Sequence, residues 1–90
     1  MIYKLLNGKS IDTGSQLSFE ERNFIQKMLI YEFLGIEVED FRRRWRTVGN
    51  PVWQDEASLK APSPAMEILL DLEKRIHLRA NFHEEAGKSE

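Results

Sequence analysis

The chain has 90 residues, with thirteen Lys and Arg against fifteen Asp and Glu, a formal net charge of −2 and no cysteine. This length fits one domain and leaves no room for a second. The lack of cysteine excludes disulfides, zinc–thiolate sites and a thiol nucleophile, and the slightly acidic balance argues against nucleic-acid binding driven by net charge.

The first predicted element is an extended segment over residues 1–14. Two short runs, Ile2 to Leu6 and Lys9 to Ile11, flank Asn7-Gly8, a dipeptide typical of a type I′ hairpin turn. An isolated hairpin this short is marginal in water, so an irregular arm is an equal alternative. The segment has one lysine before Asn7 and only a short apolar stretch, which Asn7-Gly8 breaks. This is not the pattern of a signal peptide.

The second element is a helix over residues 18–34. Ser18 and Glu21 form a capping box at its start, and Gly35 supplies a left-handed residue at its end. Helical spacing places Phe24, Ile25, Met28 and Leu29 on one stripe. Ile30, Phe33 and Leu34 then project onto the side that Asn23, Gln26 and Lys27 make polar one turn earlier. Apart from Glu32, the last two turns of the helix are therefore apolar all round.

A second helix is predicted over residues 37–48, with Val38, Phe41, Trp45 and Val48 along a narrow apolar seam. Residues 47–62 are irregular; Trp53 is expected to pin this loop to the core, and residues 55–60 to form one helical turn. Ser63 and Pro64 start a third helix that should run to residue 82. The predicted fold is mainly α: a three-helix orthogonal arrangement with an N-terminal extended arm or short β-hairpin, one domain of residues 1–83 and a disordered tail of residues 84–90.

The arginine cluster is the most prominent charged feature. Arg42, Arg43, Arg44 and Arg46 surround Trp45, and guanidinium groups bind phosphates and carboxylates bidentately. The plainer interpretation is that bases near a helix end complement its dipole, with Glu39–Arg43 and Asp40–Arg44 as i,i+4 pairs. That leaves Arg42 and Arg46, which would repel each other unless an acid from elsewhere, or a partner, lies between them.

Two further chemistries carry less support from the sequence. A helix-turn-helix would place Glu37, Glu39 and Asp40 against DNA phosphates, which would repel them. Glu73 and His77, one turn apart, are compatible with acid–base work or half a metal site, but a boundary ion pair is the favoured explanation. No HExxH sequence or glycine-rich phosphate loop is present, so we expect no enzyme, no metal and no cofactor.

The sequence therefore predicts a small non-enzymatic accessory or regulatory protein that acts by protein–protein interaction, with a protein partner or as a homodimer. Ile30, Phe33 and Leu34 are the expected apolar contacts, and Arg42 and Arg46 the charges at the rim. The alternative is binding of a nucleic acid or another polyanion through Arg42, Arg43, Arg44 and Arg46. The longest apolar run, residues 28–31, is too short to span a bilayer, and we expect a cytoplasmic protein with no membrane partner.

Overall fold

The computed structural model describes residues 1–47, 52 and 62–88, with the backbone alone for residues 81–88. Its elements in chain order are β1 (Ile2–Lys4), β2 (Ser10–Asp12), α1 (Thr13–Gln16), α2 (Phe19–Leu34), α3 (Val38–Trp45) and α5 (Pro64–Lys88). The mainly helical class and the N-terminal hairpin are confirmed. Helix α1 was not predicted, and the expectations for Val48, Trp53 and residues 55–60 lie outside the described residues.

The hairpin is antiparallel, with Tyr3 opposite Ile11 in its register. Its connection differs from the predicted type I′ turn, which needs two residues with positive φ. Gly8 has φ +92°, whereas no described residue other than glycine has positive φ. The turn therefore closes over residues 5–9, where the amide of Leu5 donates to the carbonyl of Lys9 at 2.8 Å, and glycine is needed at only one position.

Helix α1 is a single turn that follows β2 directly. The carboxylate of Asp12 accepts a hydrogen bond from the amide of Gly14 at 3.0 Å, and the side chain of Gln16 accepts one from the amide of Asp12 at 2.7 Å. Asp12 is thus an N-cap, a residue type that favours helix starts. This cap was the signal in the sequence for α1.

Both long helices begin where the sequence predicts. Ser18 Oγ accepts from the amide of Glu21 at 3.1 Å, and Glu21 Oε1 accepts from the amide of Ser18 at 2.8 Å, which completes the capping box of α2. Gly35 ends α2 with φ +79°. At the start of α5, Ser63 Oγ accepts from the amide of Met66 at 3.3 Å. All three local predictions are confirmed.

The predicted ends of α3 and α5 differ from the structure. Helix α3 ends at Trp45 rather than at residue 48, because β-branched Thr47 and then Gly49-Asn50-Pro51 follow. Helix α5 continues to Lys88 rather than ending at residue 82, since no glycine or proline interrupts it before Gly87. The boundary between a domain of residues 1–83 and a tail of residues 84–90 stays a prediction.

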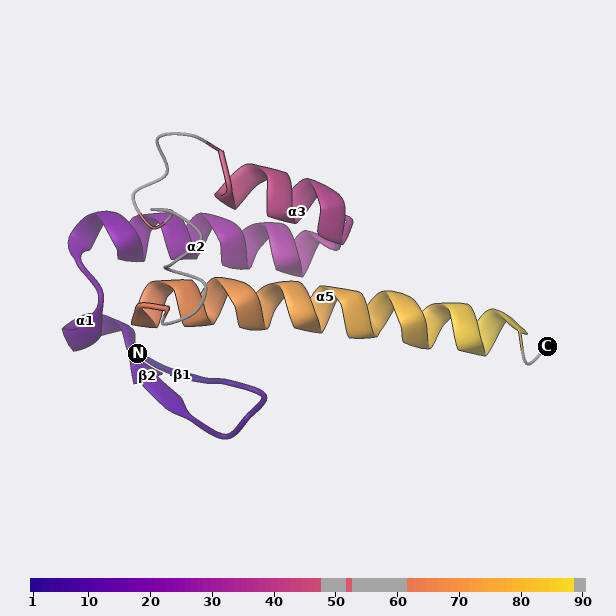
Figure 1. Cartoon of the computed structure of the whole chain (residues 1–90), viewed down its shortest axis with the longest axis horizontal. Coiled ribbons are helices and arrows are strands. Elements are labelled where there is room, and N and C mark those ends of the chain that lie inside the picture. Colours follow the sequence, from indigo (N-terminus) through magenta and orange to yellow (C-terminus); the bar gives the residue numbers. More distant parts are fainter. Residues whose placement is uncertain (48–51, 53–61, 89–90) are drawn as a thin grey trace.

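The three long elements pack around one core. Helices α2 and α5 lie side by side along the longest axis, α3 runs back beside them, and the hairpin lies on the other side of α5 from α2 in the view of Figure 1. Helix α5 contributes the largest share of the buried side chains, and Phe41 and Trp45 bring α3 onto it. The largest fully buried side chains are Ile11, Ile25, Met28, Phe41, Trp45, Met66, Ile68, Leu69 and Leu72.

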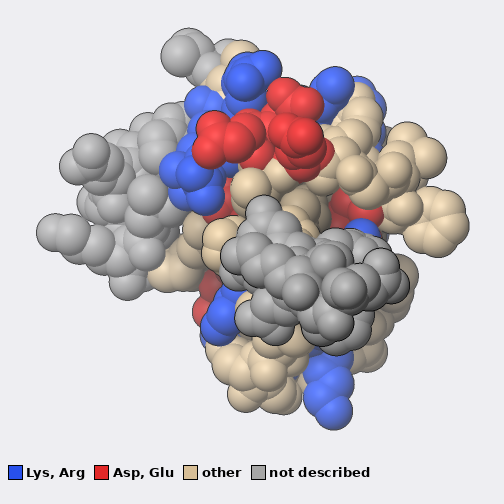
Figure 2. Space-filling view, turned by 90° about the vertical axis from the view of Figure 1, so that its right-hand side faces the viewer, with Lys and Arg blue, Asp and Glu red and all other residues tan. Residues whose placement is uncertain are grey.

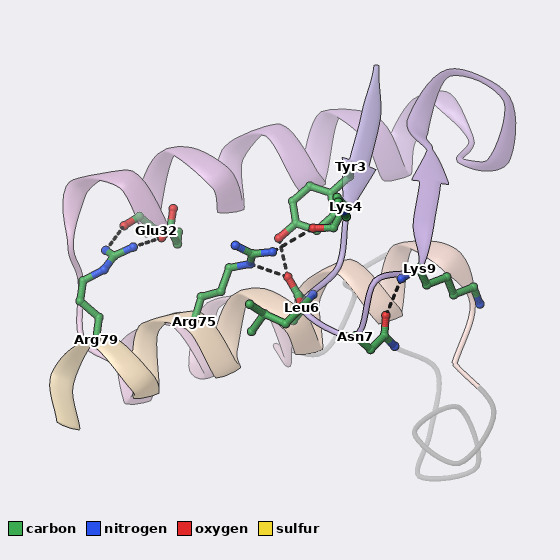
Figure 3. Close-up of polar contacts among 9 residues, drawn as sticks. Tyr3, Lys4, Leu6, Asn7, Lys9, Glu32, Arg75 and Arg79 are labelled. Atoms are coloured by element: carbon green, nitrogen blue, oxygen red, sulfur yellow. Dashed lines mark hydrogen bonds and ion pairs between the residues drawn. The ribbon is translucent and has the colours of Figure 1, made fainter. Parts of the chain in front are cut away.

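Asp71 of α5 attaches the hairpin to the helices. Its carboxylate accepts hydrogen bonds from the Tyr3 hydroxyl (2.8 Å), the amide of Leu6 (2.8 Å) and Arg75 Nε (2.6 Å). Arg75 also donates to the carbonyl of Lys4 at 2.8 Å (Figure 3). Asp71 and Arg75 thus bind two backbone groups, the amide of Leu6 just after β1 and the carbonyl of Lys4 at its end. The hairpin is therefore fixed to α5 by charge-assisted hydrogen bonds.

These contacts shift the titration of the groups involved. Burial alone would raise the pKa of Asp71, but the hydrogen bonds from Arg75, Leu6 and Tyr3 outweigh it and hold that pKa below its ordinary value. Burial and the neighbouring carboxylate raise the pKa of the Tyr3 hydroxyl. Asp71 is therefore ionised in the folded protein at neutral pH.

Replacing this carboxylate tests its contribution. Because the folded-state pKa of Asp71 is lowered, its contribution to stability is present above the unfolded value near pH ~4 and is lost as pH falls through the folded value. Asp71→Asn should lower the free energy of unfolding by about 1–3 kcal/mol at neutral pH, and by less in acid. Urea denaturation across this pH range measures it.

Asp40→Asn is the matched control, since Asp40 carries an exposed carboxylate on α3. It should change stability by less than about 0.5 kcal/mol. A deficit for Asp71→Asn that stays the same from neutral pH into acid would contradict the role assigned to the charge.

Candidate functional site

The arginines of α3 meet a buried acid from α5. Glu73 is only 8% exposed, and its Oε1 accepts a hydrogen bond from the Trp45 indole Nε1 at 2.6 Å. Arg42 Nε lies 3.4 Å from the same oxygen, and Arg46 Nη2 lies 3.7 Å from Oε2. One carboxylate of α5 thus binds Arg42 and Trp45 of α3 and Arg46 at its C-cap.

Glu73 is the acid that Arg42 and Arg46 need between them. Arg42 and Arg46 are four residues apart on a helix and would repel each other. The carboxylate of Glu73, about thirty positions further along the chain, relieves this repulsion. Burial of Glu73 is acceptable because indole and guanidinium groups satisfy its oxygens. The structure therefore gives these two arginines a role within the fold, and their predicted role at an interface rim loses support.

The other two arginines also have partners within the chain, though not the predicted ones. Arg43 pairs with Asp40 (Nη1 to Oδ1, 3.2 Å) rather than with Glu39. Arg44 lies over the Tyr31 ring, with Cζ 4.4 Å from the ring centroid, rather than beside Asp40. The two predicted i,i+4 pairs are wrong because Asp40 is three residues from Arg43, also within reach on a helix, and an aromatic face attracts Arg44.

Charges of both signs are interspersed at the end of the molecule where α3 begins. Figure 2 shows acidic side chains gathered beside basic ones on this face, and Glu39 and Asp40 lie in the first turn of α3. A polyanion binds best to a continuous basic surface. This face does not offer one.

The apolar end of α2 is exposed. The exposed fractions are 57% for Ile30, 84% for Phe33 and 67% for Leu34. Helix α5 covers the side of α2 that carries Ile25 and Met28, and α3 lies against another side through the Arg44–Tyr31 contact. These exposed fractions exclude the alternative that other parts of the chain cover this apolar end.

Phe19 belongs to the same exposed surface and was not singled out from the sequence. It is the first residue of α2 and is 70% exposed. At 100° per residue it projects in nearly the same direction as Ile30 and between Phe33 and Leu34. Its position eleven residues before Ile30, three helical turns away, was the signal that could have identified it.

The remaining polar pairs hold helices together. Arg79 of α5 donates to the carboxylate and, at 3.3 Å, to the backbone carbonyl of Glu32 on α2 (Figure 3). Lys9 of the hairpin pairs with Glu67 of α5 at 2.9 Å. Glu73 turns towards Trp45, while His77 is exposed. Among the described residues, no three His, Asp or Glu side chains are grouped so that they could hold a metal ion.

Comparison with known proteins identifies no relative. No family model, no curated protein and no solved structure matches the chain. Within the described part of the chain, no helix is both long and apolar enough to cross a membrane.

The Glu73 cluster can be tested by its coupling energy. Glu73→Ala should lower the free energy of unfolding by about 3 kcal/mol, because it removes the buried acceptor of the Trp45 indole. In a double-mutant cycle, Glu73→Gln and Trp45→Phe should show a coupling of about 1 kcal/mol. Urea unfolding of the four proteins measures it.

Glu39→Gln, at an exposed acid of α3, is the control and should change stability by less than about 0.5 kcal/mol. Strictly additive effects of the Glu73 and Trp45 substitutions would contradict the buried hydrogen bond.

Proposed function

We propose that the protein is a small non-enzymatic accessory protein that acts by protein–protein interaction through the outer face of α2. The observation that carries the proposal is the exposure of Phe33, with Ile30 and Leu34 beside it. Scattered exposed apolar residues are ordinary, but adjacent ones on a rigid element mark contact surfaces. Three large apolar side chains within five residues on one helix face are such a group.

The surface also has the composition of an interface. Aromatic and aliphatic anchors supply most of the binding free energy in protein complexes, and charges are depleted at their centres. The capping box at Ser18 and the left-handed Gly35 define both ends of α2, so the anchors stand on a helix with a fixed start and end. Such a surface loses little conformational entropy on binding.

The arginines contribute less to this proposal than the sequence implied. Arg42 and Arg46 are engaged by Glu73, Arg43 by Asp40 and Arg44 by the Tyr31 ring. Polyanion binding through these four residues stays an alternative prediction, and a partner would have to compete with those contacts. Binding that is absent at low salt would remove it.

Site-specific photo-crosslinking tests the proposed surface. A benzophenone analogue of phenylalanine at position 33 should give a crosslinked protein adduct in extracts of the native cells, because this side chain is a contact residue. The same analogue at Leu6, an exposed apolar residue of the hairpin turn, is the matched control and should give none. Mass spectrometry of the adduct identifies the partner.

No adduct at position 33, or equal adducts at both positions, would contradict the proposal. Phe33→Ser should meanwhile change the free energy of unfolding by less than about 0.5 kcal/mol, because the side chain is already in solvent. A larger loss would assign Phe33 to the fold instead.

A further inference from the structure

The outer face of α2 carries a regular seam. Phe19, Asn23, Gln26, Ile30 and Phe33 follow one another at intervals of four, three, four and three residues, and all five are exposed. This is the heptad spacing by which one helix packs against another in a coiled coil. None of the five is charged, although charged residues make up 31% of the chain.

We propose that this seam is occupied by a second copy of the chain, with the two α2 helices antiparallel about a twofold axis. The inference rests on the proposed function, since it names the partner of the same surface. A twofold interface must be self-complementary: whenever one residue contacts another, the reverse contact also forms. The order of residues along α2 meets this condition.

In the antiparallel register, unlike positions of the heptad face each other. Phe19 of one copy then lies opposite Ile30 of the second copy, and Asn23 opposite Gln26 of the second copy, and each contact occurs twice. Apolar side chains meet apolar ones, and amides meet amides with which they can exchange hydrogen bonds. A polar pair at the centre of such a seam fixes the register.

The charges beside the seam fit the same register. Glu20 and Lys27 occupy equivalent flanking positions, one residue after Phe19 and Gln26 respectively, and both are exposed. The antiparallel register places Glu20 next to Lys27 of the second copy, and the twofold axis places Lys27 next to Glu20 of the second copy. Within the described part of the chain, neither side chain has an ion pair that would compete.

A parallel pair is disfavoured by the same flanking residues. In a parallel coiled coil, a residue that immediately precedes a seam position lies beside the residue five positions further along the partner helix. Arg22 would lie next to Lys27 of the second copy, twice, and like charges repel. The antiparallel arrangement instead places Arg22 near the uncharged Leu29.

The interface is limited by the length of α2. Its 16 residues span about 24 Å, so the dimer falls at the lower end of specific interfaces, about 1,200 Å². We therefore expect association that depends on concentration. Phe33 and Leu34 extend beyond Phe19 of the second copy and enlarge the apolar contact.

Charge exchange tests the register by sedimentation equilibrium of the full chain. The unmodified protein should form a dimer as concentration rises. Glu20→Lys and Lys27→Glu should each weaken self-association about tenfold, because each turns two attractive contacts into two repulsive ones. An equimolar mixture of these two variants should form heterodimers, and the double variant Glu20→Lys/Lys27→Glu should self-associate as the unmodified protein does. Circular dichroism melting of each variant checks that it folds.

Three results would overturn the inference: a monomer at every concentration, single variants that associate as tightly as the unmodified protein, or a double variant that fails to recover. These outcomes separate the inference from the proposed function. A monomer that still crosslinks from position 33 to a different protein would leave the proposed function standing and remove the second copy. Adducts of twice the chain mass support both.

Discussion

A buried carboxylate needs hydrogen-bond donors from neighbouring elements, and α5 carries two buried carboxylates, Asp71 and Glu73. Asp71 binds Tyr3 of β1 and Leu6, two residues after that strand, and Glu73 binds Trp45 of α3. The two acids are only two residues apart, so they face different sides of α5. The hairpin and α3 are thereby fixed on one helix whose apolar residues form the centre of the core. Loss of either carboxylate would leave buried donors without an acceptor.

Local signals in the sequence predicted where the two long helices begin and where α2 ends. They could not predict contacts between residues far apart in the sequence. The Ser18–Glu21 capping box and Gly35 define α2 because every group involved lies within a few residues. Glu73 could not be assigned to Arg42 and Arg46, since that contact depends on how α3 packs on α5. The repulsion between the two arginines nevertheless predicted that an acid or a partner had to lie between them. In the hairpin, Asn7-Gly8 predicted the turn but not its length.

The packing also explains why the outer face of α2 is left open. Helix α5 covers the stripe that carries Ile25 and Met28, and α3 is held by Glu73 and by the Arg44–Tyr31 contact. No described element covers the direction in which Phe19, Ile30 and Phe33 project. The exposed seam is therefore not needed by the fold, which is consistent with the contact proposed for it. The four arginines, for which the sequence offered polyanion binding as an alternative, have partners within the molecule.

The central claim is that the outer face of α2 binds a second copy of the chain, and amide chemical shifts in a dilution series test it most directly. The account predicts that the ¹⁵N–¹H resonances that move with concentration belong to residues along the seam, from Phe19 to Phe33, and that those of β1, β2 and the arginines of α3 stay in place. Resonances that do not move at any concentration, or concentration-dependent shifts confined to α3 or the hairpin, would contradict it.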